Sequence, residues 1–320
     1  MQYWDSNELL LDDGHGNQLT VMAGFRMVRE GWEVPGQKAV VTWTTIWIVA
    51  LNAVKAWRYG TEGISEWPRL RMDTKNQCGG SFQSPINITT SAAIFDSSLG
   101  PINFLHYREA LREAVIENDG HTVTITPTRR SKAFVTLDDL PGVYKFKQLH
   151  FHWGDKSTQG SEHRVDGKSF AMEMHLVHFN TLYDSTEEAY EHPDGLLVVA
   201  VLFKIEKHGN RALGSVVKAI RRMNKRADRQ VQLSQFASLA DLLPQKPSLS
   251  YFYRGSLTTP PCAEAVIWAV LKNYEKVSES QLEVFRHLQA EETPDGTLHL
   301  VNNFRPSMPL NGRRVYKNFP

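Results

Sequence analysis

Two histidines one residue apart, His150 and His152, are the first residues whose types and spacing suggest chemistry. They lie in the segment KQLHFHWGDKSTQGSEH, residues 147–163. In a β-strand, residues i and i+2 point to the same face, so both imidazoles would share a face with Gln148. A strand face that carries an amide and two imidazoles is typical of a polar site. Two hydrogen-bonded core histidines would give the same pattern.

A second segment, AMEMHLVHFN at residues 171–180, repeats this arrangement. Glu173 and His175 share a strand face there, as Gln148 and His150 do in the first segment. A metal-bound imidazole usually hydrogen-bonds through its second nitrogen to a carboxylate, amide or carbonyl, which Glu173 and Gln148 supply. Three neutral imidazoles with one open position are usual for catalytic zinc. We therefore predict a Zn²⁺ site whose ligands are His150, His152 and His175. Calcium and magnesium do not suit these ligands, whereas iron, cobalt and copper do.

A hydroxyl and a carboxylate would complete such a site. Thr258 and Thr259 precede two prolines in GSLTTPPC, residues 255–262, which predicts a rigid turn. Glu162 is close in sequence to the two histidine segments. A hydroxyl that accepts a hydrogen bond from a metal-bound hydroxide must donate its own proton to another acceptor, and a buried carboxylate is a suitable one. We therefore expect Thr258 and Glu162 to act together.

The elements that position these residues are mostly strands. Short runs of alternating apolar and polar residues, separated by turn signals, predict strands at 121–127, 144–153, 169–180 and 265–273. The continuous apolar run at 195–205 predicts a strand buried on both faces. Helical spacing predicts helices at 211–227 and 278–288, and Ser278 with Gln281 forms a capping-box pattern. The fold class is therefore β-dominated α+β, with a few short peripheral helices.

Composition limits the choice of partners. The chain has 320 residues, with 36 Lys and Arg against 35 Asp and Glu. This balance gives no reason to expect nucleic acid or an anionic membrane as a partner. From Trp57 onward there is no linker, repeat or long charge block, so we predict that residues 57–320 form one domain.

The N-terminal region suggests a compartment. Residues 39–54 carry no charge, but the run is short for a membrane span and suits a secretory signal better. Small residues in Val54-Lys55-Ala56 would permit cleavage before Trp57, so we assign residues 39–56 to a signal and its cleavage region. An uncleaved signal-anchor and a buried core segment are the alternatives. We expect residues 1–38 to be a poorly ordered lead, or to lie upstream of a true start at Met27.

Two further features depend on that compartment. Cys78 and Cys262 belong to no CxxC motif, so they are either inert core thiols or one long-range disulfide. Asn87-Ile88-Thr89 is a glycosylation sequon, usable if the chain is secreted. The localisation we predict is secreted or extracellular, with a membrane-tethered form as the alternative.

The chain resembles the α-class carbonic anhydrases over roughly residues 57–317. The matching segments are WRYG (57–60), CGGSFQSPINI (78–88), NDGHTV (118–123), QLHFHWG (148–154), GSEHRVDGKSFAMEMHLVHFN (160–180), PDGLLVVAVLFKI (193–205), YRGSLTTPPC (253–262), VIWAVL (266–271) and NNFRPSMPLNGR (302–313). The resemblance implies a large, mostly antiparallel twisted β-sheet with zinc at the base of a conical cleft. It also implies reversible hydration of carbon dioxide to bicarbonate and a proton, by attack of a zinc-bound hydroxide. Water is the further partner, and sulfonamides or anions are the inhibitors that it implies.

The same resemblance implies a role for each site residue. The three histidines match zinc ligands, and Gln148 and Glu173 match the groups that hydrogen-bond them. Thr258 matches the hydroxyl that orients the hydroxide, and Glu162 matches the carboxylate that fixes this hydroxyl. His121 matches a proton shuttle, Tyr59 matches a tyrosine that orders cleft water, and Thr259 matches a residue beside the substrate. The apolar wall of the substrate pocket is matched by Val177, Val198, Leu257, Val266 and Trp268. Cys78 and Cys262 match the disulfide of the secreted branches.

The chain also departs from the family pattern. Asp119 and Thr124 stand where many members carry asparagines on the polar side of the cleft. Two other functions compete with that of an active enzyme. A catalytically weak binding or matrix module would normally lack a zinc ligand, and all three are present. A zinc peptidase would normally carry an HExxH motif, which is absent.

Overall fold

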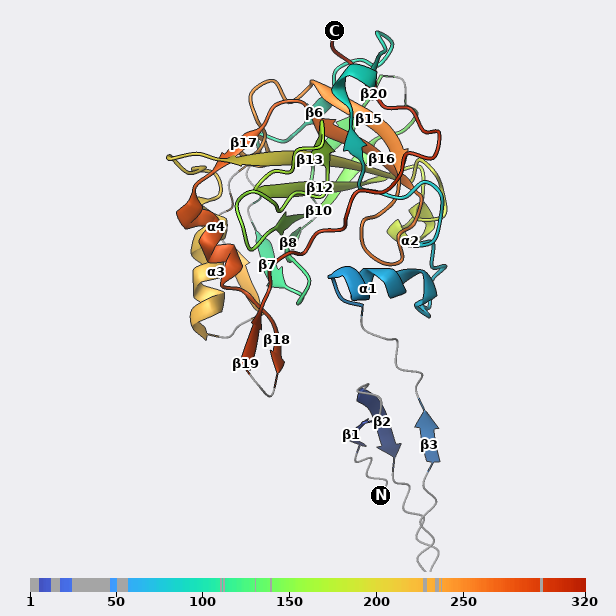
Figure 1. The fold of residues 1–320 in the computed structure, drawn as a ribbon, viewed down its shortest axis with the longest axis vertical. Coiled ribbons are helices and arrows are strands. Elements are labelled where there is room, and N and C mark those ends of the chain that lie inside the picture. The colour runs from blue at the N-terminus through green and yellow to red at the C-terminus, as the bar shows by residue number, and fades with distance from the viewer. Residues whose placement is uncertain are drawn as a thin grey trace, which may run out of the picture. The chain divides into compact units, whose positions relative to one another are not determined.

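The computed structural model describes residues 6–12, 18–24, 47–50, 57–109, 111, 113–129, 131–138, 140–226, 229–233, 236, 238–293 and 296–320 (Figure 1). The chain divides into two compact units, residues 1–56 and residues 57–320. In the first unit, an antiparallel sheet is formed by β1 (Ser6–Asp12), β2 (Gln18–Gly24) and β3 (Trp47–Ala50).

Most of the predicted lead (1–38) and signal region (39–56) lies outside the described residues, so both assignments stay predictions. None of the helices in the described parts of the chain is long and apolar enough to span a membrane.

The second unit is built on one large sheet, which has 13 strands in the described part of the chain. Its main path runs through β14 (Gln230–Leu233), β7 (Ala114–Asn118), β8 (Val123–Pro127), β10 (Tyr144–Trp153), β12 (Met172–Asn180), β13 (Leu196–Ile205), β16 (Val266–Leu271), β15 (Ser250–Gly255), β20 (Tyr316–Lys317) and β5 (Ile94–Phe95). Off this path lie β17 (Glu275–Val277), which pairs with β13, and β9 (Phe134–Thr136), which joins β10 to β6 (Asn103–Leu105). Most neighbours are antiparallel. The parallel pairs in this sheet are β13 with β16, β13 with β17, and β20 with β5.

Two small strand pairs complete the described β-structure. Strands β4 (Asn87–Ile88) and β11 (Arg164–Val165) pair in parallel. Strands β18 (Gln289–Thr293) and β19 (Gly296–His299) form an antiparallel hairpin.

The strand that crosses the middle of the sheet is buried on both faces, as its continuous apolar run predicts. In β13, Leu197 and Val199 belong to the larger hydrophobic cluster, and Val198 and Ala200 belong to a second cluster. Because successive residues of a strand point to opposite faces, the two clusters lie on opposite sides of the sheet. The predicted strands at 144–153 and 195–205 are confirmed as β10 and β13 to within one residue.

Helices are few and lie at the edges of the domain (Figure 1). Among the described residues they are α1 (Thr61–Glu66), α2 (Thr186–Ala189), α3 (Gly214–Arg226) and α4 (Glu279–Arg286), with short 3₁₀ turns at Trp67–Arg69, Thr90–Ala92 and Leu239–Leu242. The predicted capping box of α4 is formed, because Ser278 and Gln281 each bond the other's backbone N–H. The β-dominated α+β class with short peripheral helices is confirmed.

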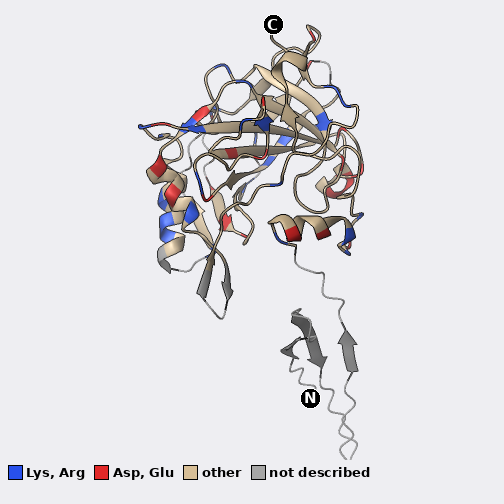
Figure 2. Ribbon diagram, viewed as in Figure 1, with Lys and Arg blue, Asp and Glu red and all other residues tan. Residues whose placement is uncertain are grey.

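Charged residues of both signs are distributed over the domain, and basic residues gather on α3 (Figure 2). Lys218, Arg221 and Arg222 of this helix are exposed. The opposite side of the helix carries Val216, Ile220 and Met223, which are buried in the larger hydrophobic cluster. The basic residues therefore form the solvated face of an amphipathic helix.

Candidate metal centre

Three imidazoles converge on one face of two neighbouring strands. His150 in β10 lies directly opposite His175 in β12, and His152 lies opposite Glu173. Residues opposite each other in an antiparallel pair share a face, so this register brings the predicted ligands together. His175 Nδ1 lies 3.1 Å from His152 Nε2 and 3.3 Å from His150 Nε2. The three residues form a group able to hold a metal ion.

Each imidazole is oriented by a hydrogen bond from its other ring nitrogen. His150 Nδ1 donates to Gln148 Oε1 at 3.0 Å, and His175 Nε2 donates to Glu173 Oε1 at 2.7 Å. His152 Nδ1 donates to the carbonyl of Asn303 at 2.7 Å. A carboxylate and a backbone carbonyl only accept, which fixes the tautomers of His175 and His152. The nitrogens facing the centre therefore carry lone pairs.

This arrangement suits a cation between the inner nitrogens. Lone pairs that face one another at such short distances repel unless a positive charge lies between them. Burial lowers the pKa of His150 well below its ordinary value, and the neighbouring imidazoles lower it further. Burial likewise lowers the pKa of His175. Both rings are therefore neutral at physiological pH, which is the form that binds metal. Two nitrogens bound tetrahedrally to zinc at about 2.0–2.1 Å lie roughly 3.3 Å apart, which agrees with the distances found here.

Glu173 joins the triad to a buried histidine that was given no role from sequence. His163 Nδ1 lies 2.6 Å from Glu173 Oε1, and Glu173 Oε2 accepts the backbone N–H groups of Glu162 and His163. Burial opposes ionisation of Glu173, but His163 and His175 outweigh it and hold the pKa of this carboxyl well below its usual range. His163 Nε2 lies 2.7 Å from the hydroxyl of Tyr253, which extends the buried network to β15.

Glu162 lies beside the triad with one oxygen free. Its Oε1 accepts the backbone N–H of Arg305 at 2.8 Å. Its Oε2 is buried, lies 3.5 Å from His152 Nε2, and has no hydrogen-bond partner among the described residues. A buried carboxylate oxygen without a donor is costly unless a ligand or solvent group satisfies it. This orphaned acceptor is a second feature of the structure that fits a metal site with a coordinated water.

Thr258 is buried in the turn predicted from its sequence. The backbone N–H of Cys262 donates to the carbonyl of Thr259 at 2.8 Å and closes the turn. The expected hydrogen bond from Thr258 to Glu162 is not formed, because neither carboxylate oxygen accepts from it. The role expected for this hydroxyl stays a prediction.

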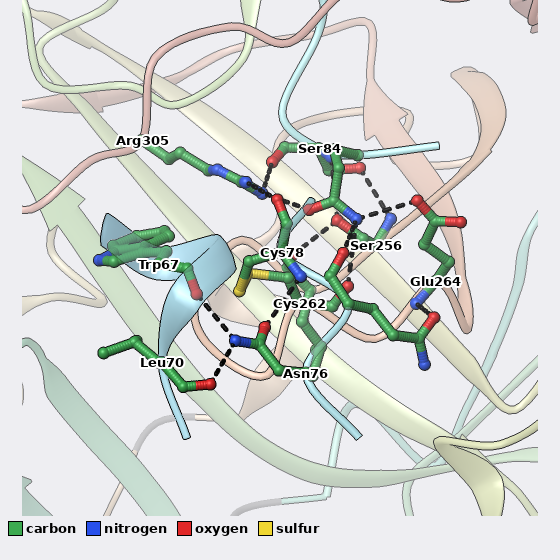
Figure 3. Close-up of a disulfide and its surroundings, with 12 residues drawn as sticks. Trp67, Leu70, Asn76, Cys78, Ser84, Ser256, Cys262, Glu264 and Arg305 are labelled. Atoms are coloured by element: carbon green, nitrogen blue, oxygen red, sulfur yellow. Dashed lines mark hydrogen bonds between the residues drawn. A yellow bond between two sulfur atoms is a disulfide. The ribbon is translucent and has the colours of Figure 1, made fainter. Parts of the chain in front are cut away.

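A disulfide ties this turn to the start of the domain. Cys78 and Cys262 are bonded, which decides between inert thiols and a long-range bridge. Figure 3 shows the bridge, with Trp67 and Arg305 nearby. The Arg305 guanidinium donates to the carbonyl of Cys78 at 3.3 Å and to that of Ser84 at 3.0 Å. Since the backbone of Arg305 also bonds Glu162, the bridge and the site share one buried network.

The predicted apolar wall forms one row across three strands. Val177 in β12 lies opposite Val198 in β13, which lies opposite Trp268 in β16. Val266 is buried in the same cluster, and Leu257 packs against it. The ring of Trp268 contacts that of His175, with centroids 4.8 Å apart. The wall therefore borders the triad.

His121 lies at the end of the turn Asp119–Gly120, half-buried, as its position before β8 predicts. Its ring stacks on Trp57 at 3.8 Å between centroids, and its Nε2 lies 2.8 Å from the Trp57 carbonyl. Tyr59 packs in the same aromatic group, with its ring centroid 5.2 Å from that of Trp57. Burial raises the pKa of Tyr59 well above its usual value, aided by the carboxylates of Glu162 and Asp119, so its hydroxyl stays protonated.

The sequon residue Asn87 is half-buried in β4, where its Oδ1 accepts the backbone N–H of Gly167 at 2.8 Å. Its glycosylation stays a prediction.

Sequence reasoning missed two residues of the centre that lie far along the chain. Asn303 supplies the carbonyl for His152, and its side chain bonds the backbone of β10 at Phe151 and Trp153. Arg305 supplies the N–H for Glu162. Both belong to the extended segment 300–310, where no periodicity marks a contact with β10. His163 directly follows Glu162 in the sequence, so it could have been proposed as a residue of the site on that ground.

Comparison with known proteins adds a family to this geometry. A model of eukaryotic-type carbonic anhydrase matches residues 62–319. Carbonic anhydrase 7 of Mus musculus is 41% identical over 268 residues, covering 82% of this chain and 97% of the relative. Carbonic anhydrase 15 of Mus musculus is 38% identical over 268 residues, covering 81% of this chain and 82% of the relative. Carbonic anhydrase 6 of Mus musculus is 33% identical over 288 residues, covering 88% of this chain and 87% of the relative.

Proposed function

The chain belongs to the eukaryotic-type carbonic anhydrase family, and on this basis we propose that its histidine triad binds Zn²⁺ and catalyses the reversible hydration of carbon dioxide. The observation that supports the metal most strongly is the convergence of three imidazole lone pairs whose outer nitrogens are already engaged. His150, His152 and His175 would hold the ion. When bound, zinc brings the pKa of a coordinated water into the neutral range, as is established for carbonic anhydrases, and so supplies the nucleophile.

The residues around the ion would orient the reacting oxygen. We assign the free Oε2 of Glu162 as the acceptor for the hydroxyl proton of Thr258. With its proton directed there, the Thr258 oxygen can only accept, so it would select one orientation of the attacking hydroxyl. Positioning of this kind lowers the barrier by removing unproductive arrangements of the reactants.

The apolar wall would hold the other reactant. Carbon dioxide has no net charge or dipole, so a surface made of Val177, Val198 and Trp268 suits it better than a polar one. We place Leu257, Thr259 and Val266 at the same pocket. Because Trp268 contacts His175, the carbon atom would lie next to the nucleophile.

The reaction releases a proton that must leave the site. We assign its transfer to His121, because the ring nitrogens of an imidazole can both accept and donate a proton and this residue is half-buried. Tyr59, which stays protonated, would order the water between the metal and His121.

We further propose that the domain, residues 57–320, functions outside the cytosol. The Cys78–Cys262 disulfide supports this, since such bonds persist in oxidising compartments. Removal of residues 39–56 as a signal, and glycosylation of Asn87, belong to the same proposal.

Stopped-flow carbon dioxide hydration, with a pH indicator, tests the function. Purified protein should be active, lose activity after dialysis against a zinc chelator, and regain it when zinc is returned. An active protein that is indifferent to prolonged chelation would contradict a zinc mechanism. A protein that binds zinc without hydrating carbon dioxide would contradict the catalytic role.

A further inference from the structure

A second pocket, of about 490 Å³, lies on the other side of the sheet from the apolar wall. Its floor is hydrophobic. Phe252, Ile267 and Leu137 are buried in the larger cluster, and Leu99, Leu140 and Tyr316 are partly buried against it. A pocket of this size is within the usual range for a small-molecule site.

The rim of this pocket is cationic. Arg254 lies opposite Ile267 in the strand register and two residues from Phe252, so its side chain shares their face of the sheet. One of its guanidinium nitrogens donates to the carbonyl of Pro193 at 3.2 Å. Arg314 is exposed and makes no hydrogen bond or ion pair with the described part of the chain. Most of the donors of these two guanidinium groups are therefore available to a ligand.

The other two charged residues of the lining are already engaged. Arg313 donates to the backbone carbonyls of Leu310, Arg254 and Gln83, so these donors hold the domain together. The Asp96 carboxylate accepts the N–H and the hydroxyl of Ser98 at 3.0 and 2.6 Å. These hydrogen bonds remove neither charge, but three arginines stand against one carboxylate in the lining, so the net charge of the rim is positive.

We propose that this pocket binds an amphiphilic carboxylate, such as a medium-chain fatty acid. The apolar chain would cover the floor of Phe252, Ile267 and Leu137, and the carboxylate would bond to Arg254 and Arg314. Arginine suits this role because its guanidinium can bind a carboxylate through two parallel hydrogen bonds. The two surfaces are adjacent in one pocket, so one molecule can reach both.

The site is separate from the metal centre but lies behind a strand of the apolar wall, β16. Ile267 lies between Val266 and Trp268 in β16, and Phe252 precedes Tyr253 in β15. Because neighbouring residues of a strand point to opposite faces, the bound chain would contact the back of β16, which carries Val266 and Trp268 of the apolar wall. Such a ligand would not occupy the metal centre.

Isothermal titration of the full chain with decanoate, below its micelle-forming concentration, tests this inference. We expect one saturable site. Arg254→Gln with Arg314→Gln should weaken binding by about tenfold or more, since charge-assisted hydrogen bonds are lost. Arg314→Gln alone, which breaks no hydrogen bond of the described chain, should weaken it in the same direction. Arg221→Gln, an exposed arginine on α3 outside the pocket, is the matched control and should bind as wild type.

Two comparisons separate binding in this pocket from adsorption of the alkyl chain alone and from binding at the metal centre. Decanol has the same chain without the charge, and should bind far more weakly than decanoate. His150→Ala protein should bind decanoate as wild type, whether or not the zinc proposal is correct. The inference is overturned by the absence of saturable binding, by equal affinity in the arginine variants, by equal affinity for decanol, or by loss of binding in His150→Ala.

Discussion

Each histidine of the triad is held by a bond to its outer nitrogen, and these bonds come from different sources. Gln148 and Glu173 lie two residues before the histidines that they orient, on the same strand. Asn303 reaches His152 from a distant segment. The inner nitrogens are therefore aimed before any ion binds, which lowers the cost of assembling the site.

Replacing Gln148 by Ala tests this orienting role. The variant leaves His150 free to rotate, so zinc affinity should fall by about tenfold or more. Competition with a chromogenic chelator measures the affinity. Lys147→Ala, at the exposed neighbouring position, is the control and should keep the wild-type value. Equal affinity in all three proteins would show that Gln148 does not orient the ligand.

Replacing His121 by Ala tests proton transfer. We expect turnover to fall in weak buffer and to recover in concentrated buffer, because buffer molecules can then carry the proton. Zinc content should remain unchanged. Stopped-flow rates across a series of buffer concentrations provide the measurement. An equal loss of rate at every buffer concentration would argue against a shuttle.

At the scale of elements, strand alternation decides how much of the site could be predicted. Side chains alternate between the two faces of a strand, and this alternation depends only on sequence position. It therefore predicted that His150 and His152 share one face of β10 and that Glu173 and His175 share one face of β12. The continuous apolar run likewise identified β13. The register that sets His150 opposite His175 depends on pairing between segments, so sequence could only suggest it.

The rest of the site required tertiary structure. Asn303 and Arg305 contact β10 and Glu162 from an extended segment that has no repeating pattern. The short helices α1 and α2 contain too few turns to show helical periodicity. The disulfide pairing could be expected only from family resemblance, since two cysteines alone left free thiols open.

The disulfide links two elements, the segment before β4 and the turn that carries Thr258. Replacing both Cys78 and Cys262 by Ser should lower the free energy of unfolding by about 2–5 kcal/mol, since the unfolded chain regains the freedom that the bridge removed. Urea unfolding of the oxidised wild type and the double variant measures the difference. Coincident unfolding curves would contradict a stabilising role.

At the scale of the whole molecule, we expect acid stability to depend on a buried histidine outside the metal centre. His178 donates to the Leu197 carbonyl and contacts the Tyr107 hydroxyl. Burial lowers its pKa from 6.5 to about 4. The unfolded chain therefore binds this proton more readily than the folded protein. The neutral ring's contribution is complete above about pH 6.5 and is lost as pH falls toward 4.

This pKa predicts a specific change in stability. Between neutral pH and about pH 4, His178 should account for a loss of roughly 3 kcal/mol. In His178→Gln, urea unfolding should show a correspondingly smaller dependence on pH. His208→Gln, which replaces an exposed histidine, should follow the wild type. If His178→Gln also follows the wild type, the buried ring does not govern acid stability.

The central claim is that three histidines of this domain hold a catalytic zinc ion. The most direct test measures zinc content and carbon dioxide hydration on the same preparations of wild type and His150→Ala. We predict about one zinc per wild-type chain, and loss of both zinc and hydration in the variant. An active wild type without zinc, or a variant that retains both zinc and full activity, would contradict the claim.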